Sequence, residues 1–218
     1  MTLRRPPAAS LFDEIEPTAD LAPGARLLRR FASDEEALIA AVDRIVGVAP
    51  FRHMLTPGGR RMSVAMTACG AVGWVSDRRG YRYDSVDPDS GNAWPSMPAV
   101  FADLAGSAAA RCGFAGFAPD TCLINRYEPG AKLSLHVDRD ERDFSAPIVS
   151  VSLGLPAVFL FGGLQRADPT ERIPLFSGDV VVWGGPSRLR YHGILPLDDG
   201  GHPLTGRYRI NLTFRKSA

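Results

Sequence analysis

The chain has 218 residues, of which 45% are hydrophobic and 22% are charged, a composition that excludes a disordered or fibrous protein. Its 25 basic and 24 acidic residues leave a net charge of +1, so no global field draws it to a polyanion and any nucleic-acid contact has to rest on local charge. The length suits one domain with a full core, and no apolar run approaches the roughly 18 residues that a membrane span needs.

The N-terminal 30 residues are rich in Pro and Ala, and we expect them to be loosely ordered at the start. Acidic residues follow where a secretory signal would place its apolar region, which predicts a cytoplasmic protein. The three cysteines, Cys69, Cys112 and Cys122, form no C-x-x-C pair. We therefore expect buried free thiols rather than a disulfide scaffold or a cysteine zinc site.

Two helices are predicted next. The first begins at a capping box made by Ser33 and Glu36 and ends near Gly47, and the second runs from about residue 96 to 111, before Gly113. Their buried faces are expected to consist of Leu38, Ala41 and Ile45 in the first helix and Val100, Phe101, Leu104 and Ala108 in the second.

After Gly113 the pattern changes to short apolar runs separated by Gly and Pro. We expect strands at 121–128, 131–138, 147–154, 157–162, 172–176, 179–184, 188–193 and 207–215. Many short strands at close spacing favour a mainly β sandwich or jelly roll with the two helices packed outside it.

The strand 131–138 carries the first candidate chemistry. Strict alternation would place Leu133, Leu135 and Val137 on one face and His136 and Asp138 on the other. An imidazole and a carboxylate side by side can bind one metal ion, and a third ligand from another strand, a histidine or a carboxylate, completes a facial triad of the kind typical of non-haem Fe(II) oxygenases. His192 is the best candidate for that ligand, whereas His53 and His202 lie in loop-like contexts and are expected at the surface. Because H-x-D occurs readily by chance, the spacing alone is a weak signal.

The last strand, 207–215, alternates between an apolar and a polar face. The polar face consists of Arg207, Arg209, Asn211, Thr213 and Arg215. One interpretation is a half-buried strand with a solvated polar face. The other is a site for a di-anionic co-substrate inside the jelly roll, in which guanidinium groups bind carboxylates and Asn125 and Tyr127 add donors.

Several segments together carry a family resemblance: MSVAMTACG (62–70), CLINRYEPGAKLSLHVDRDE (122–141), PIVSVSLGLPAVFLFGG (147–163), GDVVVWGG (178–185), RLRYHGI (188–194) and INLTFR (210–215). In their order and spacing they resemble the bacterial AlkB family of alkylation-repair dioxygenases, over about residues 11–216. The resemblance implies a double-stranded β-helix (jelly roll) with an N-terminal nucleotide-recognition lid. It divides the single domain, 1–218, into a partly loose segment at 1–30, helices and lid at about 31–113, and a catalytic core at about 114–218.

The resemblance also implies the cofactors and their ligands. Fe(II) would be bound by His136, Asp138 and His192, and 2-oxoglutarate would occupy a site formed by Asn125, Tyr127, Leu133, Arg209, Asn211 and Arg215. With O2 as the second co-substrate, the reaction would demethylate N-alkylated bases such as 1-methyladenine and 3-methylcytosine, releasing formaldehyde, succinate and CO2. Here the difficult chemistry belongs to iron and the keto acid.

The substrate would be alkylated DNA, single- or double-stranded, with RNA as the alternative. Methylation at these ring nitrogens makes the base cationic and easy to extrude, so an aromatic ring and an anion suit it. The family pattern places Trp74 against the flipped base and Asp140 near its charge, with Lys132 and Arg139 as phosphate contacts. It assigns further nucleotide contacts to Thr56, Met66, Tyr81, Arg82, Tyr83 and Arg166.

Two positions depart from the family pattern as we map it. An aromatic residue is commoner at Arg60 and a polar residue at Val137, so strand preference and the choice between DNA and RNA stay open. Two other functions compete. A catalytically silent nucleic-acid-binding jelly roll would be expected to have a damaged ligand set, and a small-molecule hydroxylase would lack Trp74, Tyr81 and Asp140. We expect a monomer with no membrane contact.

Overall fold

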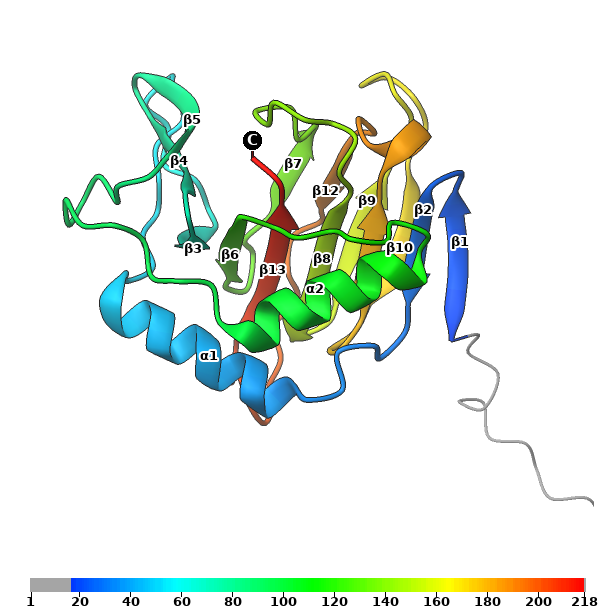
Figure 1. Cartoon of the computed structure of the whole chain (residues 1–218), viewed down its shortest axis with the longest axis horizontal. Coiled ribbons are helices and arrows are strands. Elements are labelled where there is room, and N and C mark those ends of the chain that lie inside the picture. The colour runs from blue at the N-terminus through cyan, green and yellow to red at the C-terminus, as the bar shows by residue number, and fades with distance from the viewer. Residues whose placement is uncertain (1–16, 218) are drawn as a thin grey trace, which may run out of the picture.

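Two β-sheets and two helices build the fold of residues 17–217, which are the residues that this computed structural model describes (Figure 1). The larger sheet has the order β1-β2-β11-β8-β13-β6-β3, the smaller β10-β9-β12-β7, and β4 and β5 form a separate hairpin. The large sheet consists of β1 (Thr18–Ala22), β2 (Ala25–Leu28), β3 (Ala65–Gly70), β6 (Thr121–Tyr127), β8 (Ile148–Gly154), β11 (Val180–Trp183) and β13 (Arg209–Arg215). The small sheet consists of β7 (Leu133–His136), β9 (Ala157–Phe161), β10 (Glu171–Leu175) and β12 (His192–Ile194). The predicted jelly-roll class is confirmed.

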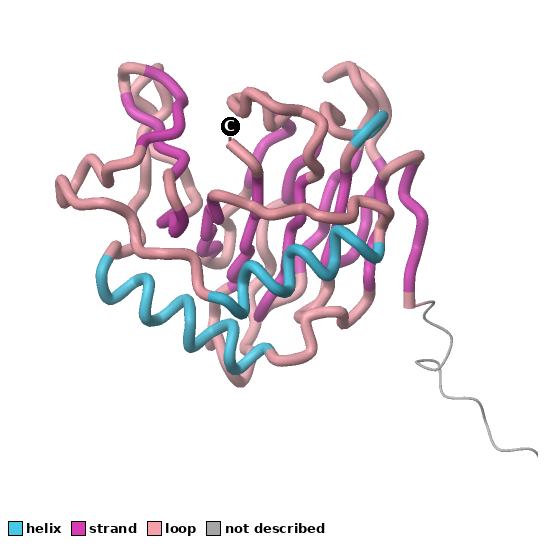
Figure 2. Tube along the Cα trace, viewed as in Figure 1, coloured by secondary structure: helices cyan, strands magenta, loops and turns pink. Residues whose placement is uncertain are grey.

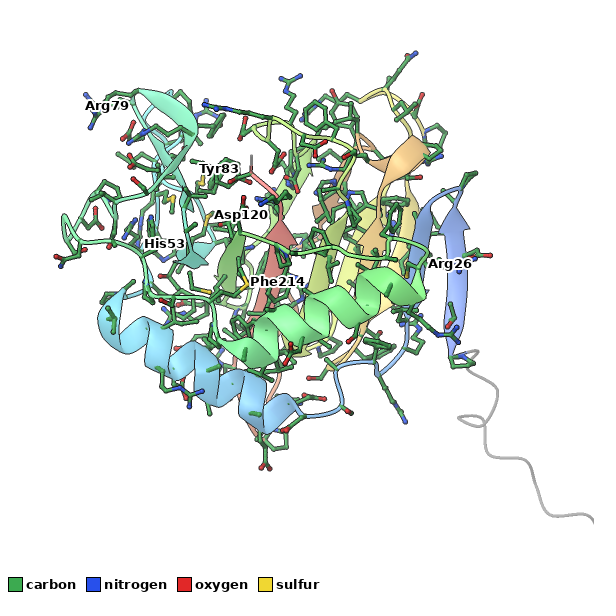
Figure 3. All side chains as sticks on the ribbon, in the orientation of Figure 1. Arg26, His53, Arg79, Tyr83, Asp120 and Phe214 are labelled. Carbon is green, nitrogen blue, oxygen red and sulfur yellow. The ribbon has the colours of Figure 1, made fainter. Side chains whose placement is uncertain are left out.

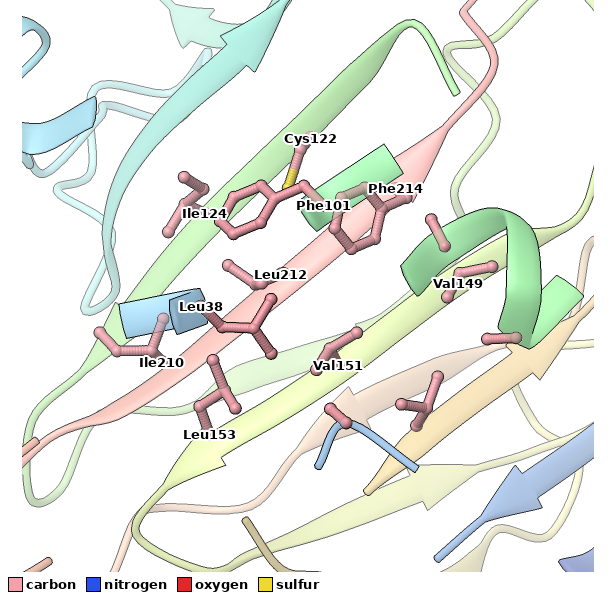
Figure 4. Packing of buried hydrophobic residues seen from close by; sticks show 14 of the residues in the cluster. Leu38, Phe101, Cys122, Ile124, Val149, Val151, Leu153, Ile210, Leu212 and Phe214 are labelled. Atoms are coloured by element: carbon pink, nitrogen blue, oxygen red, sulfur yellow. The ribbon is translucent and has the colours of Figure 1, made fainter. Parts of the chain in front are cut away.

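The helices α1 (Glu35–Val48) and α2 (Ala99–Arg111) cover the outer face of the large sheet (Figures 1 and 2). Apolar side chains of both helices and of the sheet form one cluster there (Figure 4), in which Phe101 meets Phe214 edge to face with ring centroids 5.7 Å apart. The N-cap of α1 is Asp34, whose side chain accepts from the Ala37 amide, rather than the predicted Ser33. An ionised carboxylate binds a free amide at a helix N-terminus more strongly than a hydroxyl does, which explains the choice.

A second apolar cluster lies between the two sheets. Consecutive residues of one strand enter different clusters: Leu28 packs under the helices and Leu27 between the sheets, as do Val182 and Val181 of β11. Burial on both faces explains why these strands are continuous apolar runs instead of alternating ones. The helix side and the inter-sheet side are therefore two separate cores that share one sheet.

Three parts of the chain differ from the expected organisation. The start of the N-terminal segment, expected to be loosely ordered, falls on residues 1–16, which lie outside the described residues, whereas 18–28 form β1 and β2 at the edge of the large sheet, where no strand is predicted. Their strands are too short to give a pattern, although Gly24, in the left-handed region at φ 77°, marks the hairpin turn. The jelly roll is thus not confined to 114–218, because β1, β2 and β3 join it. Residues 188–191, expected in a strand, follow the short 3-10 helix η1 (Gly185–Ser187), and β12 starts only at His192.

The hairpin of β4 (Gly73–Asp77) and β5 (Gly80–Asp84) projects beyond the sheets on the side of β3 and β6 (Figure 1). It falls in the region where the lid is expected. None of the helices between residues 17 and 217 is both long and apolar enough to cross a membrane.

Phe101→Ala is expected to lower the free energy of unfolding by about 3–5 kcal/mol, because it leaves a cavity between α2 and β13. Val48→Ala, at a side chain that is 66% exposed at the end of α1, should change it by less than about 0.5 kcal/mol. Chemical denaturation of both variants measures the difference. Equal stability of the two would contradict the packing described for the outer core.

Candidate active site

Three candidate metal ligands converge at one end of the small sheet. His136 and His192 are directly paired across β7 and β12, and their ring centroids lie 4.3 Å apart. Asp138, two residues beyond the end of β7, places Oδ1 3.6 Å from His136 Nε2 and Oδ2 3.7 Å from His192 Nε2. One donor atom of each residue lies within 4.8 Å of the others, so the three can hold a single metal ion. The predicted convergence is confirmed.

A β-bulge sets this geometry. His192 pairs with His136 but Ile194 pairs with Leu133, so β7 holds one extra residue opposite Gly193. A Cβ at Gly193 would lie 2.7 Å from the Leu133 carbonyl oxygen, which explains why glycine stands there. The extra residue shifts the alternation: Leu133 packs against the apolar cluster between the sheets and lines the cavity together with His136. The prediction from strict alternation, which places Leu133 and His136 on opposite faces of the strand, is therefore wrong at Leu133. The position of Leu133 at the cavity, which the family resemblance implies, agrees with the structure.

Backbone carbonyls orient both imidazoles. Nδ1 of His136 lies 2.9 Å from the Ser134 carbonyl oxygen, and Nδ1 of His192 lies 3.0 Å from that of Arg190. A carbonyl only accepts, so each Nδ1 carries the proton and each Nε2 keeps a lone pair for a metal. Burial, with the nearby charge of His136, lowers the pKa of His192 to about 4, so its ring is neutral at pH 7.

The carboxylate of Asp138 is buried and stays ionised. Burial by itself would raise its pKa, but the guanidinium of Arg215 and the two imidazoles outweigh that effect and hold the pKa well below its usual range. Arg215 donates to Asp138 Oδ2 through Nη2 at 2.6 Å and Nε at 3.1 Å. Two imidazoles and one carboxylate form a donor set that suits a ferrous ion.

Arg209 is a buried cation that has no anionic partner within residues 17–217. It is 1% exposed, its Nη2 donates to Ser152 Oγ at 2.9 Å, and its guanidinium lies over the Tyr127 ring at 4.9 Å. Among the described residues its Nε and Nη1 have no hydrogen-bond partner, and no carboxylate pairs with it. A buried, uncompensated guanidinium is costly unless an anion binds beside it. The polar face of β13 is therefore an interior binding surface, and the interpretation as a solvated face is wrong.

Hydrogen bonds hold the side-chain amides of Asn211 and Asn125 in place at the cavity wall between Arg209 and Arg215. Asn211 Nδ2 donates to Ser150 Oγ at 2.8 Å and to the Val151 carbonyl at 2.9 Å, while its Oδ1 accepts from Thr213 and from Asn125. The cavity wall between the two arginines is thus polar and preorganised.

All these groups open into one cavity of about 740 Å³. Of the residues predicted for the site, it is lined by Thr56, Met66, Trp74, Tyr81, Asn125, Tyr127, Leu133, His136, Asp138, Asp140, Arg166, His192, Arg209, Asn211 and Arg215. Lys132, Arg139 and the atypical Arg60 line it as well. Arg82 and Tyr83 do not: Arg82 pairs with Asp77 and Asp84, and Tyr83 bonds to buried charges.

Aromatic side chains of the hairpin and the carboxylate of Asp140 meet in the cavity that the triad also lines. Trp74 stacks on Tyr81 with ring centroids 5.5 Å apart and an interplanar angle of 15°. Its indole Nε1 donates to Asp140 Oδ2 at 2.7 Å. An exposed carboxylate therefore stands beside an aromatic surface inside the same cavity.

Some residues of the site escaped sequence reasoning. Trp183 lies beneath His192 with ring centroids 5.0 Å apart, and Phe159 lies 6.0 Å from the same ring. Glu141 and Arg188 form a buried ion pair behind Asp138, at 3.0 Å. The adjacent letters of D-R-D-E were the only signal for Glu141, and nothing in the sequence pairs it with Arg188.

Comparison with known proteins identifies the class that this fold and cluster define. Residues 24–215 match the family model of the 2OG-Fe(II) oxygenase superfamily, so the chain belongs to that superfamily. The solved structure of OsALKBH1 has a TM-score of 0.80 and 32% sequence identity, covering 92% of this chain and 100% of that one.

Within the superfamily, the chain belongs to the AlkB family of dioxygenases. It is 58% identical to the Alpha-ketoglutarate-dependent dioxygenase AlkB of Salmonella typhimurium, over 94% of this chain and 96% of that protein. It is 57% identical to the protein of the same description from Escherichia coli, over 95% and 97%. The cofactors of the family are Fe(II) and 2-oxoglutarate, with O2. The donor set of the triad fits Fe(II), and the unpaired guanidinium of Arg209 fits a carboxylate of the keto acid.

His136→Ala is expected to abolish turnover and to weaken Fe(II) binding beyond the roughly 10- to 100-fold that an outer-sphere change costs. His202→Ala, at a histidine far along the chain that does not line the cavity, is the matched control and should keep both. Metal content after gel filtration and succinate release measure the two effects. Full iron loading of His136→Ala would refute the triad.

Arg209→Ala is expected to raise the 2-oxoglutarate concentration needed for half-maximal turnover by about 10- to 150-fold, the equivalent of one or two charge-assisted hydrogen bonds. The control is Arg207→Ala, since Arg207 pairs with Asp199 on the exposed side at 2.8 Å. Succinate formation at varied 2-oxoglutarate gives the comparison. An unchanged requirement in Arg209→Ala would show that the unpaired guanidinium serves another anion.

Proposed function

We propose that this dioxygenase removes N-linked methyl groups from bases such as 1-methyladenine and 3-methylcytosine in DNA, as a direct-reversal repair enzyme. The observation that carries the proposal is the arrangement of Trp74, Tyr81 and Asp140 in the same cavity as the triad. An aromatic surface with a neighbouring carboxylate suits a cationic ring, and the triad in the same cavity would supply the metal centre that oxidises the methyl carbon.

The residues divide the work of catalysis. His136, Asp138 and His192 would hold Fe(II), Arg209 would bind the distal carboxylate of 2-oxoglutarate, and Arg215 lies at the iron end through its bonds to Asp138. Asn125, Tyr127, Leu133 and Asn211 would complete the co-substrate site. When bound, Fe(II) and 2-oxoglutarate supply the oxidation by O2 that hydroxylates the methyl carbon, with succinate and CO2 as by-products. The hydroxylated product loses formaldehyde and leaves the repaired base.

Recognition of the base would rest on its charge. Methylation at N1 of adenine or N3 of cytosine blocks pairing, so extrusion into a pocket costs little. The Asp140 carboxylate, exposed and bonded only to the Trp74 indole among the described residues, is available to the cationic ring. Thr56, Met66 and Tyr81 would complete the nucleotide pocket from the lid side.

The rim of the cavity would bind the phosphate backbone. Basic side chains surround it without an ion-pair partner among the described residues: Arg60, Arg61, Lys132, Arg139 and Arg166. Arg166 is fixed by donating to the Leu135 carbonyl at 2.7 Å. Because the net charge of the chain is only +1, nucleic-acid binding has to rest on local positive charge, and these basic side chains would supply it. We further propose that the protein works as a cytoplasmic monomer, which sedimentation with and without an oligonucleotide would measure.

The decisive experiment incubates the protein with Fe(II), 2-oxoglutarate and methylated oligonucleotides. Formaldehyde release from DNA oligomers carrying 1-methyladenine or 3-methylcytosine is expected. Single-stranded, double-stranded and RNA oligomers of the same sequence run in parallel, and faster release from RNA would favour the alternative of an RNA demethylase. Succinate without formaldehyde on every oligomer would overturn the proposal.

Asp140→Asn is expected to slow repair of cationic methyl bases about 10- to 100-fold more than repair of neutral adducts, because it removes the charge but keeps an oxygen for the Trp74 indole. Competition between a cationic and a neutral lesion in one reaction gives the ratio directly. An equal loss on both lesions would contradict a charge-based role.

A further inference from the structure

Behind Asp138 lies a buried cluster of charges that the catalytic roles above do not use. Glu141 and Arg188 are paired at 3.0 Å with side chains that are 1% and 3% exposed. Glu141 Oε1 also accepts the Tyr83 hydroxyl at 2.5 Å and lies 3.5 Å from Arg215 Nε. A carboxylate so far from water is retained only where cations and donors surround it, and here all of them are present.

Arg188 fastens the loop that follows β7. Its Nη1 donates to the Asp138 carbonyl at 2.8 Å, its Nε to the Ala146 carbonyl at 3.1 Å and its Nη2 to the Glu141 carboxylate. One side chain from beyond η1 thus binds three points of the segment that carries Asp138. The position of this metal-ligand candidate depends on a contact made far away in the sequence.

Arg215 joins this loop to the hairpin. It binds the Asp138 carboxylate at 2.6 Å and approaches Glu141, while its Nη1 lies 3.4 Å from the Tyr83 hydroxyl. Tyr83 belongs to β5, and its side chain lies between the hairpin and the end of β13 (Figure 3). The Tyr83 hydroxyl therefore contacts both the Glu141 carboxylate and the Arg215 guanidinium.

The hairpin has a second link to the same loop. Trp74 and Tyr83 face each other across β4 and β5, and they donate to consecutive residues, Asp140 and Glu141. The two links differ in accessibility, because Asp140 is exposed in the cavity while Glu141 is buried and Tyr83 does not line the cavity. A base that binds to Trp74 and Asp140 competes with the hydrogen bond between these two residues. The bond between Tyr83 and Glu141 stays intact.

We propose that Glu141 and Tyr83 are positioning residues that hold the β4–β5 hairpin against the metal-ligand loop while the substrate occupies the cavity. This deepens the proposed function and rests on it. In this arrangement Tyr83 acts through Glu141 and Arg215, and so replaces its expected role as a direct nucleotide contact. The hydrogen bonds of Tyr83 to Glu141 and Arg215 keep the base-binding surface at a fixed position relative to the triad. Oxidation is thereby directed to the methyl carbon.

The test compares Tyr83→Phe, Glu141→Gln and the double variant with the parent. Tyr208→Phe is the matched control, since Tyr208 is a partly exposed tyrosine outside the cavity whose ring lies 4.8 Å from the Arg126 guanidinium. Hydrogen exchange of the amides of 73–84 is measured without substrate, and formaldehyde per succinate is measured during turnover on a methylated DNA oligomer. Glu141→Gln leaves Arg188 short of a charge and can fail to fold, so Tyr83→Phe, which removes one oxygen, decides in that case.

The proposal expects exchange in 73–84 to accelerate about tenfold in Tyr83→Phe, the loss of one charge-assisted bond, with a lower ratio of formaldehyde to succinate. The effect of the double variant should be smaller than the sum of the two single effects, because Tyr83→Phe removes the bond that Glu141→Gln weakens by removing the charge. Tyr208→Phe should match the parent. Parental exchange, or faster exchange with an unchanged ratio, would overturn the positioning role.

Failure of the proposed function gives a different result. In that case the parent itself releases no formaldehyde from any oligomer. Hydrogen exchange of residues 73–84 still tests whether Tyr83 and Glu141 hold the hairpin in place. An unchanged exchange rate in Tyr83→Phe would overturn that role, whatever the activity of the parent.

Discussion

The pairing of β7 with β12 is the constraint on which the active site depends. It sets His136 directly opposite His192, so two residues far apart in sequence present their Nε2 atoms to one point. Gly193 makes the pairing possible, because the backbone of β7 passes where its Cβ would be. The bulge at the same place shifts Leu133 toward the interior, and the strand ends at His136, two residues before Asp138. Loss of this register would separate the ligands and rotate their neighbours together.

Charge inside the barrel is divided between two buried arginines on one face of β13. Arg215 has its anions within the protein, in Asp138 and Glu141, and its pKa is raised because these carboxylates outweigh the effect of burial. Arg209 has none among the described residues, and burial lowers its pKa. The two arginines therefore have different roles. The guanidinium of Arg215 positions the Asp138 carboxylate, whereas that of Arg209 is available to an anionic ligand. In the proposed function, a carboxylate of 2-oxoglutarate would supply a negative charge beside Arg209.

The sequence predicts some of this architecture and leaves other parts hidden. The alternation of β13 correctly groups Arg209, Asn211 and Arg215, because a period of two survives in a regular strand. It does not tell whether that face meets water or a second sheet, which only the tertiary fold decides. The same reasoning fails at Leu133, where a bulge interrupts the period, and at β1, which is too short to show one. The family resemblance placed the ligands and the co-substrate residues, which composition and spacing alone left open.

Long-range polar pairs are the part that no local pattern could give. Arg188 and Glu141 stand in unremarkable surroundings in the sequence, yet both are buried and each needs the other. The cavity in front of them is lined by charges of both signs: basic residues such as Arg60 and Lys132 line it, and Asp140 lies beside Trp74 in the same cavity. A methylated nucleotide has the complementary pattern, with its anionic phosphates outside and a cationic ring inside. In the proposed function, an unmodified base lacks the positive ring charge, so attraction to the basic side chains would be shared by all nucleic acid while discrimination for the lesion would arise at the Asp140 carboxylate.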